Sequence, residues 1–310
     1  MGARSTVGST VASIIGPQRA DAIRKAERRV RNGLAGRLAK GATSGAAASP
    51  SGYQPSDPFA PHREPAMTRH ELLAGVHERT RPRTYLEIGV NTGASLALSH
   101  ARSVGVDPAF KVVEPIHCDV QLVRATSDDF FTGADPLAHF EGVPVDLAFI
   151  DGMHLAEFAL RDFVNVEPHM AATGVVVLDD VLPRNALEAA RDRRTRAWAG
   201  DVYKTVEVLL RRRPDLVVLL VNTAPTGTAL VIGVDPGSTV LGSAYPEELD
   251  YLTADDPQTP PQEFLDRSIA IEPQVLLDSP VWSELVARRG AGEPADLSGL
   301  WADLRALTVA

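Results

Sequence analysis

Acidic residues follow nearly every short apolar run of the sequence, and they are the side chains best placed to do chemistry. In chain order they are Glu87, Asp107, the Ser127-Asp128-Asp129 cluster, Asp151 and the Asp179-Asp180 pair. Ligands of open α/β sheets bind at the carboxyl ends of the strands, so these carboxylates would surround one site. Each of them alone also suits a helix N-cap or a turn. Together they would repel one another unless a cation or a cationic ligand compensates their charge.

The segment 85–93 combines an apolar strand with an acid, Glu87, and two glycines, Gly89 and Gly93. Glycine lets a chain turn sharply out of a strand and leaves room for a ligand beside bare peptide. We expect a helical segment to follow, from Ala94 to Ala101. The pattern differs from the dinucleotide fingerprint because Asn91 stands where that fingerprint has its second glycine. An acid at this place favours a ligand with a cationic amino group over a pyrophosphate.

This Glu-x-Gly-x-x-x-Gly pattern resembles motif I of the class I S-adenosylmethionine (SAM) methyltransferases. The resemblance implies that Glu87, Gly89 and Gly93 hold the methionine end of SAM and that Asp107 holds the ribose. It also implies that Ser127 and Asp128 contact the adenine edge, although the segment 126–130 that contains them would also make a good helix N-cap.

Three carboxylates, Asp151, Asp179 and Asp180, are expected to converge at the ends of two neighbouring strands, where three hard oxygen donors suit Mg²⁺. Their segments resemble the metal-dependent O-methyltransferases of the catechol type and the sugar O-methyltransferases of macrolide and aminocoumarin pathways. The resemblance implies that Asp151 and His154 are catalytic. His154 stands where the catechol enzymes have a catalytic lysine, and it fits a general base, a further metal ligand or a helix-capping residue.

Five arginines follow the Asp179-Asp180 pair, between Arg184 and Arg196. Such a run is typical of a solvated helix face, or it could clamp a carboxylate or phosphate of the acceptor molecule. Trp198 and Tyr203 follow, and each could line a substrate pocket or belong to the core.

The elements that must position these residues alternate between strands and helices. Thr68 and Glu71 have the spacing of a capping box and predict a helix that ends near Thr80. The predicted strands are Thr84–Gly89, Val104–Asp107, Val120–Ala125, Asp146–Asp151, Val175–Asp179, Leu216–Asn222 and Thr228–Val234. The alternation predicts a doubly wound α/β fold with a mostly parallel seven-stranded sheet. Only a short turn separates the last two strands, so they should form an antiparallel hairpin, as in the class I methyltransferase fold.

The two ends of the chain differ from the centre, so we expect three parts with helical N- and C-terminal extensions. Residues 1–65 read as a basic arm, with a helix over 18–40, followed by a linker rich in Pro, Gly, Ala and Ser. Residues 66–235 form the predicted methyltransferase domain. Residues 236–310 form an appendage with short helices over 280–289 and 297–307, which packs on the core and covers a pocket or builds an oligomer contact.

Composition excludes several classes of protein. Cys118 is the only cysteine of the 310 residues, so an intramolecular disulfide framework is excluded and a reducing, cytoplasmic location is expected. No apolar run approaches the length of a membrane span. The net charge is −9 although residues 1–45 alone carry +7, and this acidic body disfavours nucleic acid as the main substrate.

The sequence therefore predicts a SAM-dependent methyltransferase that acts on a hydroxyl group of a small molecule with the assistance of Mg²⁺. Two alternatives stay open. One is an NAD-linked oxidoreductase on a Rossmann sheet, and the other is a catalytically inactive SAM-binding protein that uses its basic arm to hold a partner. A homo-oligomer is also left open.

Overall fold

The computed structural model describes residues 62–290 and 297–307. The predicted basic helix over 18–40 and nearly all of the linker that follows it lie outside the described residues.

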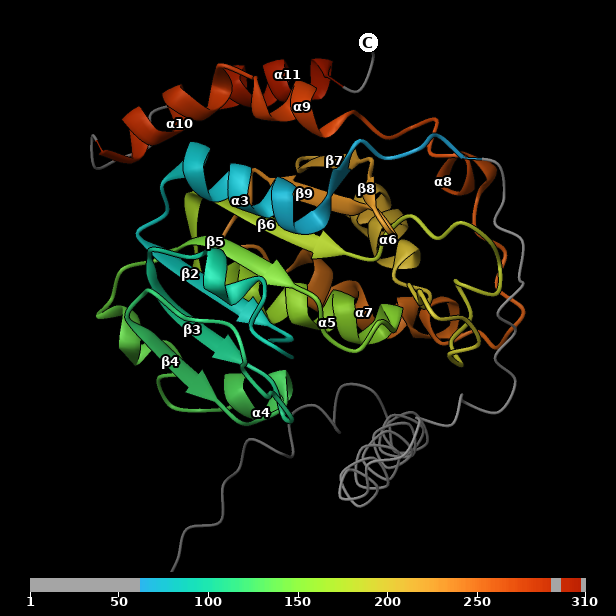
Figure 1. Ribbon diagram of the computed structural model, residues 1–310, viewed down its shortest axis with the longest axis horizontal. Helices are drawn as coiled ribbons and strands as arrows, with labels where there is room; N and C mark the ends of the chain where they lie inside the picture. The colour runs from blue at the N-terminus through green and yellow to red at the C-terminus, as the bar shows by residue number, and fades with distance from the viewer. Residues whose placement is uncertain (1–61, 291–296, 308–310) are drawn as a thin grey trace, which may run out of the picture. The chain divides into compact units, whose positions relative to one another are not determined.

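Seven strands form one sheet in the order β4-β3-β2-β5-β6-β9-β7 (Figure 1). Their bounds are β2 Thr84–Ile88, β3 Arg102–Val106, β4 Val120–Val123, β5 Val145–Ile150, β6 Met170–Asp179, β7 Val217–Val221 and β9 Thr228–Ile232. All pairs from β4 to β6 are parallel, whereas β9 runs antiparallel to both β6 and β7. The predicted mostly parallel sheet with an antiparallel closing hairpin is confirmed.

The central strands are apolar because helices cover both of their faces. Every residue of β2, β5 and β9 is buried. A strand that is buried on both sides cannot alternate apolar and polar residues, which explains the unbroken apolar runs of the sequence.

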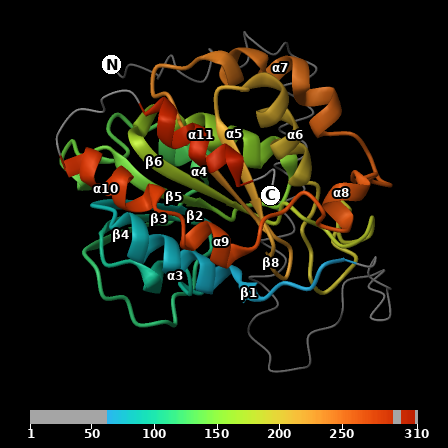
Figure 2. The same cartoon turned by 90° about the horizontal axis from the view of Figure 1, so that it is seen from above.

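Helices lie on both sides of this sheet (Figures 1 and 2). One side is covered by α3 Arg69–Thr80, α9 Pro273–Leu277, α10 Val281–Gly290 and α11 Ser298–Ala306. The other side is covered by α4 Ser127–Phe131, α5 Ala156–Val166, α6 Tyr203–Arg212, α7 Val240–Leu252 and α8 Gln262–Leu265. Short 3₁₀ turns complete the set, namely η1 Leu96–Leu98, η2 Ala138–Phe140 and η3 Glu167–His169. The arrangement is doubly wound, as predicted.

The predicted capping box is present at the start of α3. The Thr68 hydroxyl accepts from the backbone N–H of Glu71, and the Glu71 carboxylate accepts from the backbone N–H of Thr68. Just before this cap, the two-residue strand β1 Met67–Thr68 pairs in parallel with β8 Thr223–Ala224, in the β7–β9 connection. The first turn of α3 is therefore fixed beside the closing hairpin.

The helix expected from Ala94 to Ala101 is wrong, because only the single 3₁₀ turn η1 forms there. The Ser99 hydroxyl accepts from the backbone N–H of Ala101 and lies 3.0 Å from the Ser103 hydroxyl. Serine side chains that bond nearby backbone groups compete with the helical hydrogen-bond pattern, and here they end the helix after one turn.

The C-terminal residues pack on the sheet, and both helices that the sequence predicts there, now α10 and α11, are present. Trp282 on α10 is 2% exposed, and its indole N–H donates to the Leu276 carbonyl at 2.7 Å. The helix α7 is a further element that the sequence did not predict. The division at residue 235 into a domain and an appendage stays a prediction. Among the described residues, no helix has the length and apolar character that crossing a membrane requires.

Candidate active site at the carboxyl ends of the strands

Glu87, near the end of β2, is a fully buried carboxyl group with one oxygen unused. Tyr85 Oη donates to its Oε2 at 2.7 Å, while Oε1 is buried without a hydrogen-bond partner. Burial raises the pKa of Glu87 to about 8, and the charges of Asp151 and Asp107 raise it as well. The hydrogen bond from Tyr85 and the charge of Arg69 lower the pKa, but they do not offset burial. Glu87 therefore holds a proton at neutral pH unless a cationic group approaches it.

Gly89 and Gly93 both have positive φ, at 97° and 85°, so the turn needs glycine at both places. The space beside them is filled by protein. A Cβ at Gly89 would lie 1.9 Å from the Asp151 carbonyl oxygen, and a Cβ at Gly93 would lie 3.0 Å from Val112 Cγ1. The absence of a side chain at these glycines allows the turn to touch the chain after β5 and the loop after β3, and room for a ligand beside the bare peptide stays a prediction. Their role in binding SAM stays a prediction.

Asp107 follows β3 and is held by the turn that the glycines form. Its Oδ2 accepts from the backbone N–H of Asn91 at 2.8 Å, and its Oδ1 accepts from the backbone N–H of Ala109 at 2.6 Å. The backbone N–H of Lys111 in turn donates to the Asn91 carbonyl, which ties the loop after β3 to the same turn. The carboxylate is half-buried and oriented, with lone pairs left to accept the hydroxyls of a ribose.

Ser127 and Asp128 begin α4, where Thr126 is the N-cap and accepts from the backbone N–H of Asp129. The N-cap that the sequence offered as an alternative for this segment is therefore present. Ser127 Oγ donates to Asp162, whose pKa is raised to about 7 by burial, and Asp128 forms an ion pair with Arg161. Both predicted adenine contacts are engaged with α5.

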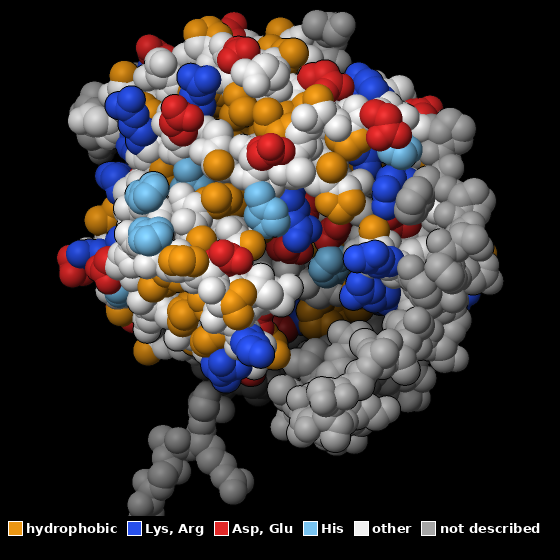
Figure 3. All heavy atoms as spheres, viewed as in Figure 1, with side chains coloured by type: hydrophobic (Ala, Val, Ile, Leu, Met, Phe, Trp, Pro, Cys, Tyr) orange, Lys and Arg blue, Asp and Glu red, His pale blue; other side chains and the backbone are white. Residues whose placement is uncertain are grey.

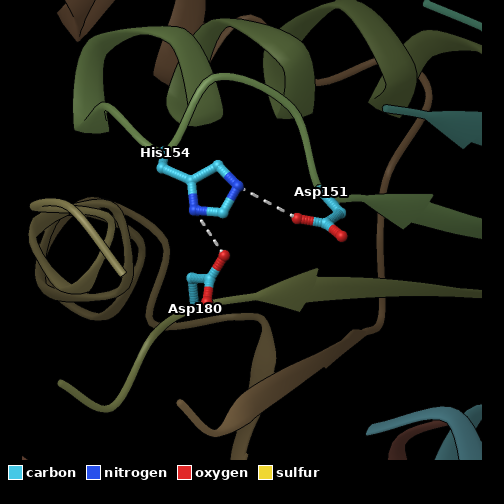
Figure 4. A group of neighbouring side chains, drawn as sticks. All are labelled: Asp151, His154 and Asp180. Atoms are coloured by element: carbon cyan, nitrogen blue, oxygen red, sulfur yellow. Dashed lines mark ion pairs between the residues drawn. The ribbon is translucent and has the colours of Figure 1, made fainter. Parts of the chain in front are cut away.

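Asp151, His154 and Asp180 form a compact cluster between the ends of β5 and β6 (Figure 4). His154 Nδ1 lies 2.6 Å from Asp180 Oδ2, and His154 Nε2 lies 3.4 Å from Asp151 Oδ1. One possible ligand atom from each residue lies within 4.8 Å of those of the other two, as a metal site requires. His154 and Asp180 have positive φ, at 55° and 63°, which is costly for non-glycine residues and occurs most often at functional sites.

The charges within this cluster depend on one another. Burial lowers the pKa of His154, but the charge and hydrogen bond of Asp180, together with Asp151, outweigh burial and raise it to about 10. Burial raises the pKa of Asp151 to about 6. Burial also acts to raise the pKa of Asp180, but the charge and hydrogen bond of His154 and the hydrogen bond from the Thr226 hydroxyl outweigh it and lower this pKa below its usual value. At neutral pH the imidazole is therefore a cation between two acids.

Asp179 is not part of this cluster and pairs with Arg69, a residue that the sequence did not single out. Arg69 Nη1 lies 2.5 Å from Asp179 Oδ2, and Arg69 Nη2 lies 3.7 Å from Asp151 Oδ2. Burial lowers the pKa of Arg69, but the charges of Asp179, Asp151 and Asp180 raise it overall. The three predicted metal ligands do come together, yet Asp179 lies outside the metal-like cluster and His154 lies inside it. The predicted ligand set stays a prediction.

The arginines after β6 are not on a helix, because the chain from Val181 to Asp201 has no regular structure. Two of them form internal ion pairs: Arg184 binds Glu188, and Arg191 binds Glu157 and Asp201 at 2.6 and 2.7 Å. The expected helix is therefore wrong, although Arg193, Arg194 and Arg196 are exposed to solvent. The guanidinium groups of Arg184 and Arg191 hold the loop in shape.

The end of that loop forms a wall beside His154. The Trp198 indole stacks on the imidazole, and the Trp198 carbonyl oxygen lies 2.9 Å from His154 Nδ1. A Cβ at Gly200, which has positive φ, would lie 1.7 Å from the His154 carbonyl oxygen, so only glycine fits there. Tyr203, the other aromatic candidate, is buried in the core against Phe264.

A family model matches the segment of the chain that contains most of these strand ends. Residues 86–181, which run from motif I to just beyond the Asp179-Asp180 pair, match the model of a family described as a methyltransferase domain. Residues 86–181 are therefore similar to a methyltransferase domain. No curated protein matches the sequence.

Solved structures of methyltransferases are similar to about half of the chain. The SAH-bound PaMTH1 of Podospora anserina is 16% identical, with a TM-score of 0.39, over 54% of this chain and 78% of its own. The O-methyltransferase TomG of Streptomyces achromogenes, involved in tomaymycin synthesis and solved with SAM, is 21% identical, with a TM-score of 0.39, over 54% and 79%. MycE of the mycinamycin pathway, solved with Mg and SAH, is 18% identical, with a TM-score of 0.37, over 53% and 48%. At these values the likeness carries no information about substrate.

The residues of this segment fit a cationic ligand and a metal ion. Among the described residues, three buried carboxylate oxygens accept no hydrogen bond, namely Glu87 Oε1, Asp151 Oδ1 and Asp179 Oδ1, and of these only Asp151 Oδ1 has an ion pair, with His154 Nε2 at 3.4 Å. A buried oxygen without a hydrogen bond is costly, and these three lie at the ends of the neighbouring strands β2, β5 and β6. Oxygen donors of this kind suit an ammonium group or Mg²⁺.

Proposed function

We propose that the protein transfers a methyl group from SAM to a hydroxyl group of a small molecule, and that Mg²⁺ assists the reaction. The observation that carries this proposal is the set of buried oxygens on Glu87, Asp151 and Asp179 that accept no hydrogen bond, within a segment similar to a methyltransferase domain. When bound, SAM would supply an activated methyl group and Mg²⁺ a Lewis acid that lowers the pKa of the acceptor hydroxyl.

The cofactor residues are proposed from the sequence and from their places at the strand ends. Glu87 Oε1 accepts from the amino group of the methionine end, beside the turn that contains Gly89 and Gly93. Asp107 accepts from the ribose hydroxyls with the lone pairs that its two backbone contacts leave free. Ser127 and Asp128, at the end of the strand next to β3, lie along the same edge and contact the adenine.

Asp151, Asp179 and Asp180 are the proposed metal ligands, and His154 is the proposed base. Nδ1 of His154 faces two acceptors, Asp180 Oδ2 and the Trp198 carbonyl, so it carries the ring proton. Nε2 is then the atom that can accept the proton of the acceptor hydroxyl as the O–CH₃ bond forms and the S–CH₃ bond breaks. A pKa of about 10 suits an acid, so the base role requires another cation to neutralise the two carboxylates.

Calorimetric titration with SAH and with Mg²⁺, paired with the variant Asp151→Asn, tests the two sites separately. We expect Asp151→Asn to abolish Mg²⁺ binding and to leave the Kd for SAH within about twofold. Loss of both ligands together would contradict separate metal and cofactor sites. Transfer of labelled methyl groups to a panel of hydroxylated small molecules, with and without Mg²⁺, then tests the reaction itself, and SAH binding without any transfer would support the inactive binding protein.

A further inference from the structure

We propose that Arg69 is a built-in counter-ion that competes with a divalent cation for Asp179 and Asp151, and thereby sets the metal affinity of the site. This inference rests on the proposed function, because it assumes that the cluster binds a metal ion.

The contacts of Arg69 place its charge between two of the three proposed ligands. Its guanidinium lies 2.5 Å from Asp179 Oδ2 and 3.7 Å from Asp151 Oδ2, so it bridges the ends of β6 and β5. The Asp179 side chain is only 1% exposed, so water cannot replace this partner. A divalent cation that uses Asp179 finds Oδ2 held by Arg69 and only Oδ1 without a partner, so it must share this carboxylate with the guanidinium or displace it.

The carboxylates are thereby divided between two positive groups. Arg69 neutralises Asp179, His154 neutralises Asp180, and Asp151 lies between the two cations. A divalent ion that enters while Arg69 is in place meets a positive charge a few ångström away, and it finds the charge of Asp179 already neutralised. Binding by all three carboxylates therefore competes with the ion pair of Arg69.

The position of Arg69 on its helix indicates that its charge serves the site. Arg69 is the first residue of α3, where the positive end of the helix dipole disfavours a cation. The Thr68 cap and the pairing of β1 with β8 hold this helix end beside the Thr223–Thr226 turn, which also supplies the Thr226 contact to Asp180. In the space-filling view, Asp and Glu side chains lie deep in a hollow near the middle of the face, with Lys or Arg and His side chains beside them (Figure 3).

Titration of the full-length protein with Mn²⁺ tests this competition without any activity measurement. Binding is followed by calorimetry and by the loss of the electron paramagnetic resonance signal of free Mn²⁺. We expect Arg69→Met to bind Mn²⁺ at least about tenfold more tightly than the unchanged protein, because the competing charge is gone. Arg79→Met is the matched control: Arg79 lies on the same helix and pairs with the exposed Asp278 at 3.8 Å, so its loss should leave the Mn²⁺ affinity unchanged.

A double variant separates competition for a ligand from a general change in charge. We expect Asp179→Asn in the Arg69→Met background to lose most of the gained affinity, because the freed carboxylate is the source of the gain. An equal Mn²⁺ affinity with and without Arg69, or a gain that survives Asp179→Asn, would overturn the inference.

Arg69→Lys keeps a charge but cannot bridge two carboxylates, and it should show a smaller gain. It provides the test if Arg69→Met does not fold, since an Arg69→Lys variant with unchanged affinity would then overturn the inference. Absence of Mn²⁺ binding in the unchanged protein and in every Arg69 variant is a different result, and it would overturn the metal-assisted function as well.

Discussion

The imidazole of His154 stacks on the indole of Trp198, with ring centroids 5.0 Å apart and ring planes 7° from parallel. The indole is itself fixed, because its N–H donates to the Ala190 carbonyl at 2.6 Å. Stacking fixes the plane of the imidazole, and within that plane Nδ1 faces Asp180 and the Trp198 carbonyl while Nε2 faces Asp151. The loop after β6 therefore sets the direction in which His154 can take a proton.

Removal of the Trp198 ring should affect methyl transfer far more than cofactor binding. We expect Trp198→Ala to lower kcat by about 10- to 100-fold, since a misplaced base loses most of its contribution. The Kd for SAH should stay within about twofold because no proposed cofactor residue touches Trp198. Trp198→Phe restores a stacked ring and should recover much of kcat. A parallel loss of SAH affinity in Trp198→Ala would instead indicate collapse of the pocket.

Cofactor affinity should rise with pH because of Glu87. Its folded pKa of about 8 lies above the ordinary value of 4.5, so below pH 8 the ammonium group of SAH must displace a proton from Glu87. We expect the Kd for SAH to fall by up to about tenfold per unit between pH 6 and 8, and to level off above. Without ligand, the same raised pKa stabilises the fold below pH 4.5, and this contribution is lost as the pH rises through 8.

Two comparisons isolate this effect of Glu87. Glu87→Gln cannot ionise and should bind SAH with little dependence on pH in this range. Methylthioadenosine lacks the ammonium group, so its affinity for the unchanged protein should also be flat. A slope of equal size in Glu87→Gln would assign the titration to another group.

A comparison of Gly89 with Gly142 tests the close approach of the turn after β2 to Asp151. Both have positive φ, but a Cβ at Gly89 would lie 1.9 Å from the Asp151 carbonyl oxygen, whereas a Cβ at Gly142 would meet nothing within 4 Å. We expect Gly142→Ala to cost about 1–2 kcal/mol of unfolding free energy from backbone strain alone. Gly89→Ala should cost at least about twice as much and should weaken both SAH and Mg²⁺ binding. Urea unfolding and calorimetry measure the two effects, and equal costs would show that Asp151 can move aside.

Arg267 is a fully buried guanidinium whose partners are a side-chain amide and backbone carbonyls. It donates to Asn222 Oδ1, to Thr223 and Pro225 in the β7–β9 connection and to Leu182 after β6, and burial lowers its pKa to about 10. Arg267→Met leaves these acceptors buried and unpaired, and we expect a loss of about 2–5 kcal/mol. Chemical denaturation measures it. The exposed Arg196 is the control, because Arg196→Met should change stability by less than about 0.5 kcal/mol.

The sheet was readable from the sequence because its strands are buried on both faces. Apolar runs such as Leu147–Ile150 leave few alternatives, and every predicted strand is present. The start of β6 at Met170 was missed because Thr173 and Gly174 interrupt the apolar pattern. The helix α7 was missed because it contains Gly242 and Pro246, and its packing on α5 and α6 overrides the low helix propensity of both residues.

The site was readable where its residues follow the ends of strands, as Asp151, Asp179 and Asp180 do, or lie close together in the chain. Asp151 and His154 are three residues apart and follow one strand, so the spacing alone brought them together. Arg69 and Asp179 are 110 positions apart, and a lone arginine behind a capping box carries no sign of such a partner. For the same reason, the sequence could not decide whether Trp198 lines the site, since only the folded loop shows that its ring stacks on His154.

The face of the sheet that α10 and α11 cover has a consequence for biosynthesis. Arg289 on α10 donates to the Thr80 carbonyl, 209 residues earlier, and to the Thr173 carbonyl of β6. In a nascent chain that has formed the central strands, Val175 and Val177 therefore stay exposed to water on this side until α10 and α11 have been made. Contacts that close so late favour slow folding and transient self-association. We therefore expect the yield of native protein from translation to depend on chaperones that shield this face until synthesis is complete.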